Sequence, residues 1–522
     1  MMDYLLILTV IGFLFSVYEV SEDYKKRSLV FKFNFIDSAA GFLLVFLFIA
    51  LILLINFFEV QDKELVVSIV CDNSGRCYDI FASYALSVVA LALALVLIIG
   101  FIVKLNSKNL AKKKEFIEDA IDRLNRRNYE SLSADLELFH DDLIRNYISQ
   151  KKNISFKDLL SATKKDTGLI KKLKDTPEKL NFVKNDRLRY SQLVDQFYFE
   201  IISNRDFLEF IAMNNLNLMF KLLDNDLSYR KEDVWEVCGK KLISEKNSRL
   251  YAELNPAFDG KPVLLNFLFK DTAKCSRYLI WKPVGDYVIN YLRDQRKKAH
   301  DEENYNEERY DLIKNESPIY TGIRFFDVMV NKALNQNTAN HMWLYYQQYF
   351  VEKILKNISY EPEAEGEFAN MYEYYLYEIF SNYRNWITYV IRNEYTVKYD
   401  ASGGPNIVQN AITSMTYSLA DVQRSKKLRS RFKSYLRELF IDSYFELVTY
   451  NKKELGYYAS HFKKEIKEAM HKDDFFIDFL EEPVNNPHNR AIWSEGLHYV
   501  MNSSDNKKLQ DFKAFLKELK KS

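Results

Sequence analysis

The chain has 522 residues, a length that predicts about two to four domains. Its 73 basic and 72 acidic side chains nearly cancel, which excludes a global electrostatic attraction to nucleic acid or to a polycation. With 14 Gly and 9 Pro, it has too few turn-forming residues for a β-sandwich, a β-barrel or a disordered linker protein. The composition therefore favours an all-α fold, in which we interpret the abundant Phe and Tyr as core residues.

Three apolar runs near the N-terminus have the composition of transmembrane helices, at about 4–20, 39–58 and 80–103. A hydrocarbon core about 30 Å thick needs about 20 apolar residues in a helix. The second and third runs contain no charged residue. A secretory signal explains the first run poorly, because Asp3 is the only charge before it and no small-residue cleavage site follows it. We expect residues 1–104 to form a transmembrane region with three helices.

The basic residues around these runs predict their orientation. Two flanks are basic, and they contain Lys25, Lys26, Arg27 and Lys32 on one side and Lys104, Lys108, Lys112, Lys113 and Lys114 on the other. The loop 59–79 is mainly acidic, so the positive-inside rule places it outside. The sequence predicts a multi-pass cell-membrane protein with its N-terminus outside and a large cytoplasmic C-terminal domain.

The outer loop carries the sequence CDNSGRC, from Cys71 to Cys77. In an oxidising compartment, two cysteines around an Asn-Ser-Gly turn favour a disulfide. A metal site is the weaker interpretation, because the loop contains no His and no further Cys. Cys238 and Cys275 fall in the cytoplasmic part, where we expect them to be reduced and buried.

The third run also carries small residues on one helix face. Their spacing is four, three and four, and they are Ser83, Ser87, Ala90 and Ala94. Such a stripe allows close helix packing in lipid, either within one chain or between copies in a homo-oligomer. The runs contain no ionisable residue at their centres, which argues against a carrier but leaves a multi-copy pore open.

The sequence after residue 104 has the pattern of helices. We expect a helical stalk with a first subdomain at 105–300 and a second subdomain at 301–522. Ile117, Ile121 and Leu124 continue a helical spacing that predicts a stalk continuous with the third run. Ser155 and Pro177 resemble helix starts. Further helices are predicted at 206–223, 283–298, 338–355, 367–390 and 425–447. No repeat of fixed period is found, so a regular solenoid is not expected.

A basic amphipathic stretch is predicted around residues 424–439, where Arg424, Lys427 and Arg431 would form a basic surface. Its apolar line comprises Leu428, Phe432, Tyr435 and Leu439. Such a helix could lie on lipid, bind RNA phosphates or dock an acidic partner. A solvated helix packed by its apolar side explains the pattern equally well.

Catalytic motifs are weak. The chain has no Walker A, HExxH, GxSxG or paired CxxC sequence, so we expect no cofactor and no metal. The dipeptides His140-Asp141 and His300-Asp301 lack convincing partners for a metal-dependent phosphohydrolase. The segment from Arg293 to His300 resembles the Arg-to-His pattern of HEPN-type ribonucleases. That resemblance implies a metal-independent cleavage in which His300 acts as acid or base and Arg293 holds the phosphate.

These observations favour a membrane-anchored, oligomeric interaction, sensing or regulatory protein that is not an enzyme. Its expected partners are the lipid bilayer, further copies of the chain and a cytoplasmic protein, while nucleic acid is a possible partner that no motif supports. One alternative is a membrane-permeabilising pore effector in anti-phage defence. The other is the HEPN-like ribonuclease.

Overall fold

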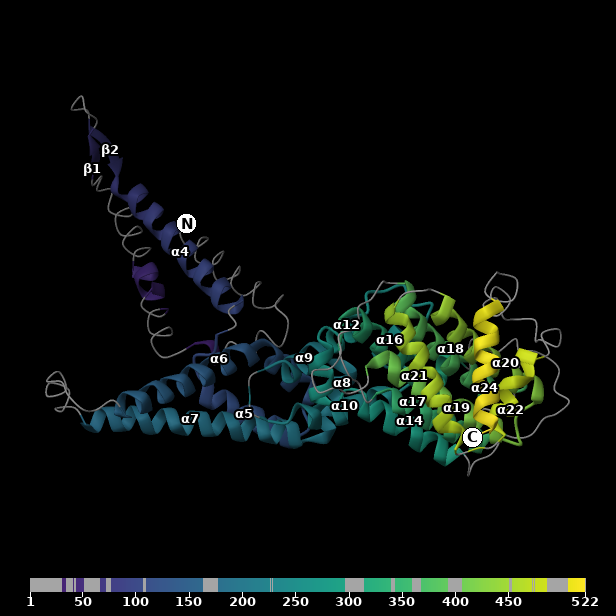
Figure 1. The fold of residues 1–522 in the computed structure, drawn as a ribbon. Coiled ribbons are helices and arrows are strands. Elements are labelled where there is room, and N and C mark those ends of the chain that lie inside the picture. Colours follow the sequence, from purple (N-terminus) through teal and green to yellow (C-terminus); the bar gives the residue numbers. More distant parts are fainter. Residues whose placement is uncertain are drawn as a thin grey trace. The chain divides into compact units, whose positions relative to one another are not determined.

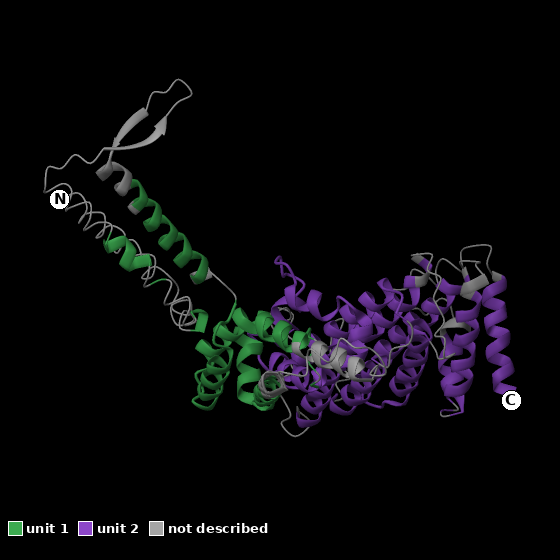
Figure 2. Cartoon of the chain, turned by 90° about the vertical axis from the view of Figure 1, so that its left-hand side faces the viewer, with its two compact units in different colours: residues 1–229 green, residues 230–522 purple. Residues whose placement is uncertain are grey.

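The computed structural model describes residues 31–33, 41, 44–50, 66–71, 77–106, 109–162, 177–225, 227, 229–295, 314–338, 343–358, 368–392, 406–449, 453–471, 473, 475–485 and 506–521. Within these ranges the chain is helical apart from one two-stranded hairpin (Figure 1). The predicted all-α class is confirmed at this level. Contacts divide the chain into two compact units, residues 1–229 and residues 230–522 (Figure 2).

The hairpin lies inside the predicted external loop, for which no strands are expected from the sequence. Strand β1 (Val66–Cys71) pairs antiparallel with β2 (Cys77–Phe81). Both strands are rich in Val, Ile and aromatic residues, which favour extended backbone. Helix α4 (Ala82–Asn106) follows β2 directly. At 1.5 Å per residue it is about 37 Å long, so the hairpin and Lys104 lie at opposite ends of it.

The rest of unit 1 is a small helical cluster. Its helices are α5 (Lys113–Asn125), α6 (Tyr129–Ala162), α7 (Pro177–Ser203), α8 (Arg205–Asn214) and α9 (Leu216–Leu223). Helix α5 packs against α6 and α7, and α9 packs against α6 and α8. Aromatic side chains such as Phe116, Phe139 and Phe197 fill the core between them.

Several predicted boundaries in unit 1 are wrong. The third apolar run does not continue into a stalk, because α4 ends at Asn106 and α5 begins at Lys113. Ile117 and Leu124 are instead the buried side of a separate helix. The predicted start at Ser155 lies inside α6, whereas the start at Pro177 is confirmed. The helix predicted at 206–223 is broken at Asn215, whose side-chain oxygen accepts the backbone N–H of Leu218 at 3.0 Å.

Unit 2 contains the remaining described helices. They are α10 (Lys231–Ser244), α11 (Arg249–Leu254), α12 (Val263–Leu268), α13 (Thr272–Tyr278), α14 (Lys282–Gln295), α16 (Pro318–Asn335), α17 (Leu344–Asn357), α18 (Met371–Arg392), α19 (Ile407–Arg424), α20 (Ser430–Thr449), α21 (Lys453–Met470), α22 (Phe476–Asn485) and α24 (Asn506–Lys521). The helices predicted at 283–298 and 367–390 correspond to α14 and α18 within a few residues.

Successive helices of unit 2 alternate between two layers. In one layer α10 packs on α14, α14 on α17, α17 on α19, and α19 on α21. In the other layer α16 packs on α18, α18 on α20, and α20 on α22. Contacts such as α18 with α19 and α20 with α21 join the layers. This is an array of stacked helix pairs of the kind found in α-solenoids, built here without a sequence period.

Large aromatic side chains hold the two layers together. Trp235, Trp343 and Trp386 are completely buried. Helical spacing places Trp343, Tyr346, Phe350 and Ile354 on one face and predicts a core there. Trp343, Phe350 and Ile354 are buried, whereas Tyr346 is half-buried. The indole N–H of Trp235 donates to the Ile280 carbonyl at 2.7 Å, so this buried polar group is satisfied.

A buried ion pair links α18 to the segment before α20. Arg429 donates to both carboxylate oxygens of Glu373, at 3.2 Å from Nε and 2.5 Å from Nη2. The same carboxylate accepts the backbone N–H of Ala369 at 2.7 Å. Glu373 is 2% exposed and Arg429 is 11% exposed, so each charge depends on the other for its stability in the interior.

Candidate functional site

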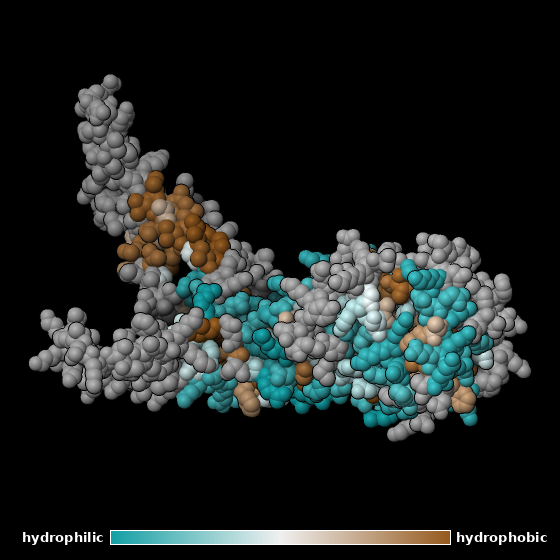
Figure 3. All heavy atoms as spheres, viewed as in Figure 1, coloured by the Kyte–Doolittle hydropathy of each residue, from teal (hydrophilic) through white to brown (hydrophobic). Residues whose placement is uncertain are grey.

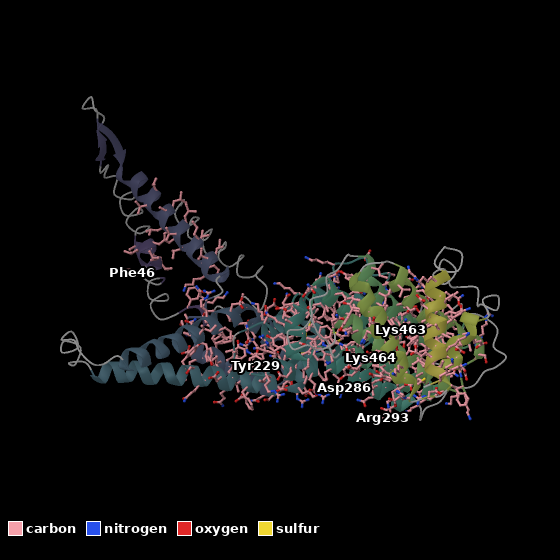
Figure 4. The ribbon with its side chains drawn as sticks, viewed as in Figure 1. Phe46, Tyr229, Asp286, Arg293, Lys463 and Lys464 are labelled. Atoms are coloured by element: carbon pink, nitrogen blue, oxygen red, sulfur yellow. The ribbon has the colours of Figure 1, made fainter. Side chains whose placement is uncertain are left out.

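The described part of the apolar region presents bare hydrocarbon on its outer surface. Brown spheres gather over α4 and the segment 44–50 in Figure 3, and Figure 4 shows Phe46 on the outside of that segment. The exposed apolar side chains are Val45, Phe46, Leu47, Ile49, Val88, Val89, Leu91, Leu95, Val96, Ile99 and Val103. An exposed apolar surface that is contiguous marks an interaction with lipid or with protein. Among the residues that the structure describes, no helix combines the length and the apolarity required to cross a bilayer.

The inner side of the same region contains one member of the predicted small-residue stripe. Ala94 is 1% exposed, although its neighbours Leu95 and Val96 are about half exposed. Phe48 is also buried, and the segment 44–50 runs beside α4 in both ribbon views (Figures 1 and 2). Burial of Ala94 within a single chain favours the packing of this stripe inside one molecule. The side chains of Ser83, Ser87 and Ala90 lie outside the described residues.

The two cysteines of the predicted outer loop face each other across the hairpin. The antiparallel register pairs Cys71 with Cys77, the last residue of β1 with the first residue of β2. Directly opposite residues of an antiparallel pair have Cα atoms about 4.5–5.5 Å apart, a separation that a disulfide accommodates. Their side chains lie outside the described residues, so the bond itself stays a prediction. Cys238 and Cys275 are buried, as expected.

The predicted basic helix is wrong in its first part. Helix α19 ends at Arg424, residues 425–429 form the connection, and α20 begins at Ser430. The predicted apolar line is largely buried, including Leu428 and Phe432.

Most basic side chains of this stretch are used within the fold. The Lys427 ammonium donates to the Lys356 carbonyl at 3.1 Å, near the end of α17. Lys433 donates to the Gln423 carbonyl at 3.0 Å, at the end of α19. Cations stabilise these helix ends because the last carbonyls carry partial negative charge. Arg424 pairs with Asp421, and Arg431 is exposed. The arrangement supports the structural interpretation over phosphate binding.

The outer face of α17, α19 and α21 carries a line of tyrosines and one histidine. Tyr345 lies close enough to Tyr417 to contribute to its raised pKa, after the larger effects of burial, Glu465 and Glu468. The Gln409 amide donates to the Tyr457 hydroxyl at 2.8 Å, and Tyr349 is about half exposed on α17. Tyrosine supplies large contact area at low conformational cost and is enriched in protein interfaces.

His461 lies on α21 within this face, one turn before Lys464, which Figure 4 labels. Its Nε2 is 3.2 Å from the Thr413 hydroxyl and 3.5 Å from a Glu465 oxygen. Burial lowers the pKa of the His461 imidazole, and the Lys464 charge lowers it further. A hydrogen bond to the Gln409 backbone and the charge of Glu468 oppose this effect without reversing it. His461 is therefore held in its neutral form by its surroundings.

We expect acidification to destabilise unit 2 through His461. Above about pH 6.5 the imidazole is neutral in both states and contributes nothing. Below that value the unfolded chain binds the proton first, so the free energy of unfolding falls as the pH falls. Urea unfolding at pH 7.5 and 5.5 should show a larger loss for the natural chain than for His461→Gln. Equal losses in the two proteins would contradict this assignment.

The structure describes some of the remaining sequence candidates. Arg293 lies exposed at the end of α14, 3.9 Å from Asp294, and His300 lies outside the described residues. Nδ1 of the buried His140 is 2.8 Å from the Tyr198 hydroxyl, whereas Asp141 binds Lys221 at 2.8 Å at the surface. Within the described ranges, no cluster of three His, Cys, Asp or Glu side chains is arranged to hold a metal ion.

Comparisons with protein-family models, curated proteins and solved structures give no match for this chain.

Proposed function

We propose that the protein is a membrane-anchored interaction and regulatory protein, in which unit 2 binds a cytoplasmic protein partner. The observation that carries this proposal is the two-layer helical array of unit 2. Stacked helix pairs present long continuous surfaces, and such surfaces are used mainly for binding other proteins. Within the array, the tyrosine-bearing face of α17, α19 and α21 is the surface that would contact this partner.

Membrane anchoring is supported by the apolar surface and by the sequence around it. The runs 39–58 and 80–103 are uncharged, and parts of both lie outside the described residues. The described parts expose aliphatic side chains that would be costly to leave in water. Lipid tails are the occupant that fits these exposed aliphatic side chains.

The proposed orientation agrees with one contact in unit 1. The positive-inside rule assigns the flank before the second run and the flank after the third run to the same side. These flanks meet in the fold, because the Lys104 ammonium donates to the Lys32 carbonyl at 3.2 Å. The hairpin lies at the opposite end of α4, which is the side that the rule assigns to the outer compartment.

The orientation predicts selective labelling of the hairpin cysteines. After reduction, an impermeant thiol reagent added to whole cells should label Cys71 and Cys77. Cys238 and Cys275 should react only after the cells are opened and the protein is denatured, because they are buried. A Cys71→Ser/Cys77→Ser variant is the matched control and should show no labelling in whole cells. Labelling of the natural protein only in opened cells would reverse the orientation.

We predict that the partner contacts exposed tyrosines of the array. Tyr349→Ala combined with Tyr457→Ala should weaken binding by tenfold or more, as is usual when interface tyrosines are truncated. The measurement is the mass of the intact assembly extracted from membranes, which reports partner and copy number together. Phe199→Ala, at an exposed aromatic residue of unit 1, is the control and should leave the assembly unchanged. An unaltered mass for the double tyrosine variant would exclude this face.

A further inference from the structure

Residues 31–33, between the first and second apolar runs, contact the helical cluster of unit 1. The Phe31 carbonyl accepts two backbone N–H groups, from Ala111 at 2.9 Å and from Lys112 at 3.1 Å. Both donors belong to the connection between α4 and α5. Two strong hydrogen bonds to one carbonyl fix this segment against a part of the chain about 80 residues later.

Side chains of the same segment extend the contact into the core. The Phe31 ring meets Phe116 of α5 edge to face at 5.4 Å, and Phe116 meets Phe139 of α6 in the same way at 5.3 Å. Lys32 is only 1% exposed, and its ammonium lies 5.7 Å from the centre of the Phe139 ring. Burial of a lysine is costly, so a position of this kind is held by specific packing.

The last turn of α4 joins the same contact. Lys104 donates to the Lys32 carbonyl, and its ammonium lies 5.6 Å from the centre of the Phe33 ring. The next residues of the chain are fixed to α6, because Asp142 accepts the Leu110 N–H at 3.0 Å and pairs with Lys113 at 3.2 Å. Residues 31–33 therefore touch the end of α4, the start of α5 and the middle of α6.

We propose that residues 31–33 form a strap that couples the apolar helices to the helical cluster of unit 1. A shift or tilt of α4 displaces Lys104 and the strap, and the strap passes the displacement to α5 through its backbone hydrogen bonds and Phe116. A change in the cluster travels in the opposite direction by the same contacts. The docking of the strap is independent of lipid, whereas its role in transmission rests on the proposed membrane anchoring.

Hydrogen exchange of the detergent-extracted full chain tests the docking. In Phe31→Ala, the amides of Ala111 and Lys112 should exchange at least tenfold faster, because their acceptor is no longer held in place. Phe46→Ala removes the same side chain from an exposed apolar position and should leave both amides unchanged. Protection in α9 shows in the same data that unit 1 is folded. If Phe31→Ala exchanges like the natural chain while α9 is protected, the strap is wrong.

A change in bilayer thickness tests whether the strap transmits a displacement of α4 to α5. The protein is placed in phosphatidylcholine vesicles with acyl chains of 14 or 22 carbons, since a change in thickness alters helix tilt. Exchange in the first turn of α5 should differ between the two lipids in the natural chain and should not differ in Phe31→Ala. If the natural chain floats with the vesicles but shows no difference, the transmission is contradicted. If it does not float, anchoring fails and the detergent result still decides the docking.

Discussion

Glu373→Gln is expected to lower the free energy of unfolding of unit 2 by about 3–5 kcal/mol, because it leaves the Arg429 charge buried without its counter-ion. The Glu373 carboxylate also holds the residues just before α18 through the Ala369 N–H. All five tryptophans lie at or after residue 235, so their fluorescence reports unit 2 alone. Urea unfolding followed by this signal measures the loss directly.

A matched control variant separates the loss of stability caused by burial of the ion pair from the loss caused by charge pairing alone. Glu352 pairs with Lys353 and Lys356 on α17, but all three side chains are substantially exposed. Glu352→Gln should cost less than about 1 kcal/mol. Glu373→Gln combined with Arg429→Met should recover most of the lost stability, because the second change removes the uncompensated charge. A cost for Glu373→Gln as small as that for Glu352→Gln would show that the pair does not stabilise the array.

Leu91→Lys is expected to weaken the insertion of α4 into membranes and to lower the fraction of protein that floats with vesicles. Leu91 is near the centre of the run 80–103, and its side chain is exposed on α4. A lysine at the middle of a membrane helix costs about 2.5–3.5 kcal/mol on the insertion scale, which changes an equilibrium more than fiftyfold. The measurement is the fraction of protein that floats with vesicles after synthesis in their presence.

Two variants control for effects of the substitution itself. Leu91→Phe keeps the position apolar and should float like the natural chain. Phe199→Lys places the same charge on an exposed aromatic position of α7 and should also float. If Leu91→Lys floats as well as both controls, the outer side of α4 does not contact lipid.

Helix content and core faces could be predicted from the sequence because they depend on local signals. Pro177 begins α7 where its fixed backbone angle suits a first turn. The spacing of Phe350 and Ile354 places them on one buried side of α17, and Trp343 is buried at the start of the same helix. In both cases the information lies within a few residues of the feature.

Two of the wrong boundaries depend on contacts made from outside the helix that ends there. The break between α4 and α5 is stabilised by the Phe31 carbonyl, which accepts the amides of Ala111 and Lys112. The end of α19 is stabilised by Lys433, and the following connection by the pair of Arg429 with Glu373. Helical spacing continues through both places in the sequence, so periodicity alone predicts an uninterrupted helix.

The basic stretch shows why a charge pattern predicts a site poorly. Arg429 and Lys427 are as basic in sequence as Arg431, yet the first forms a buried ion pair and the second contacts the end of α17. Only the folded structure determines which of these basic side chains form contacts within the protein. The two-layer array of unit 2 cannot be predicted from the sequence for a related reason. Its helices differ in length and sequence and share only their alternating position.

Vesicle flotation after washing at alkaline pH tests membrane anchoring most directly, because high pH removes proteins held by charge and leaves those dissolved in lipid. We expect the full chain to float with the vesicles after the wash. Recovery of the chain in the washed-off fraction, with unit 2 still folded by its tryptophan fluorescence, would contradict it.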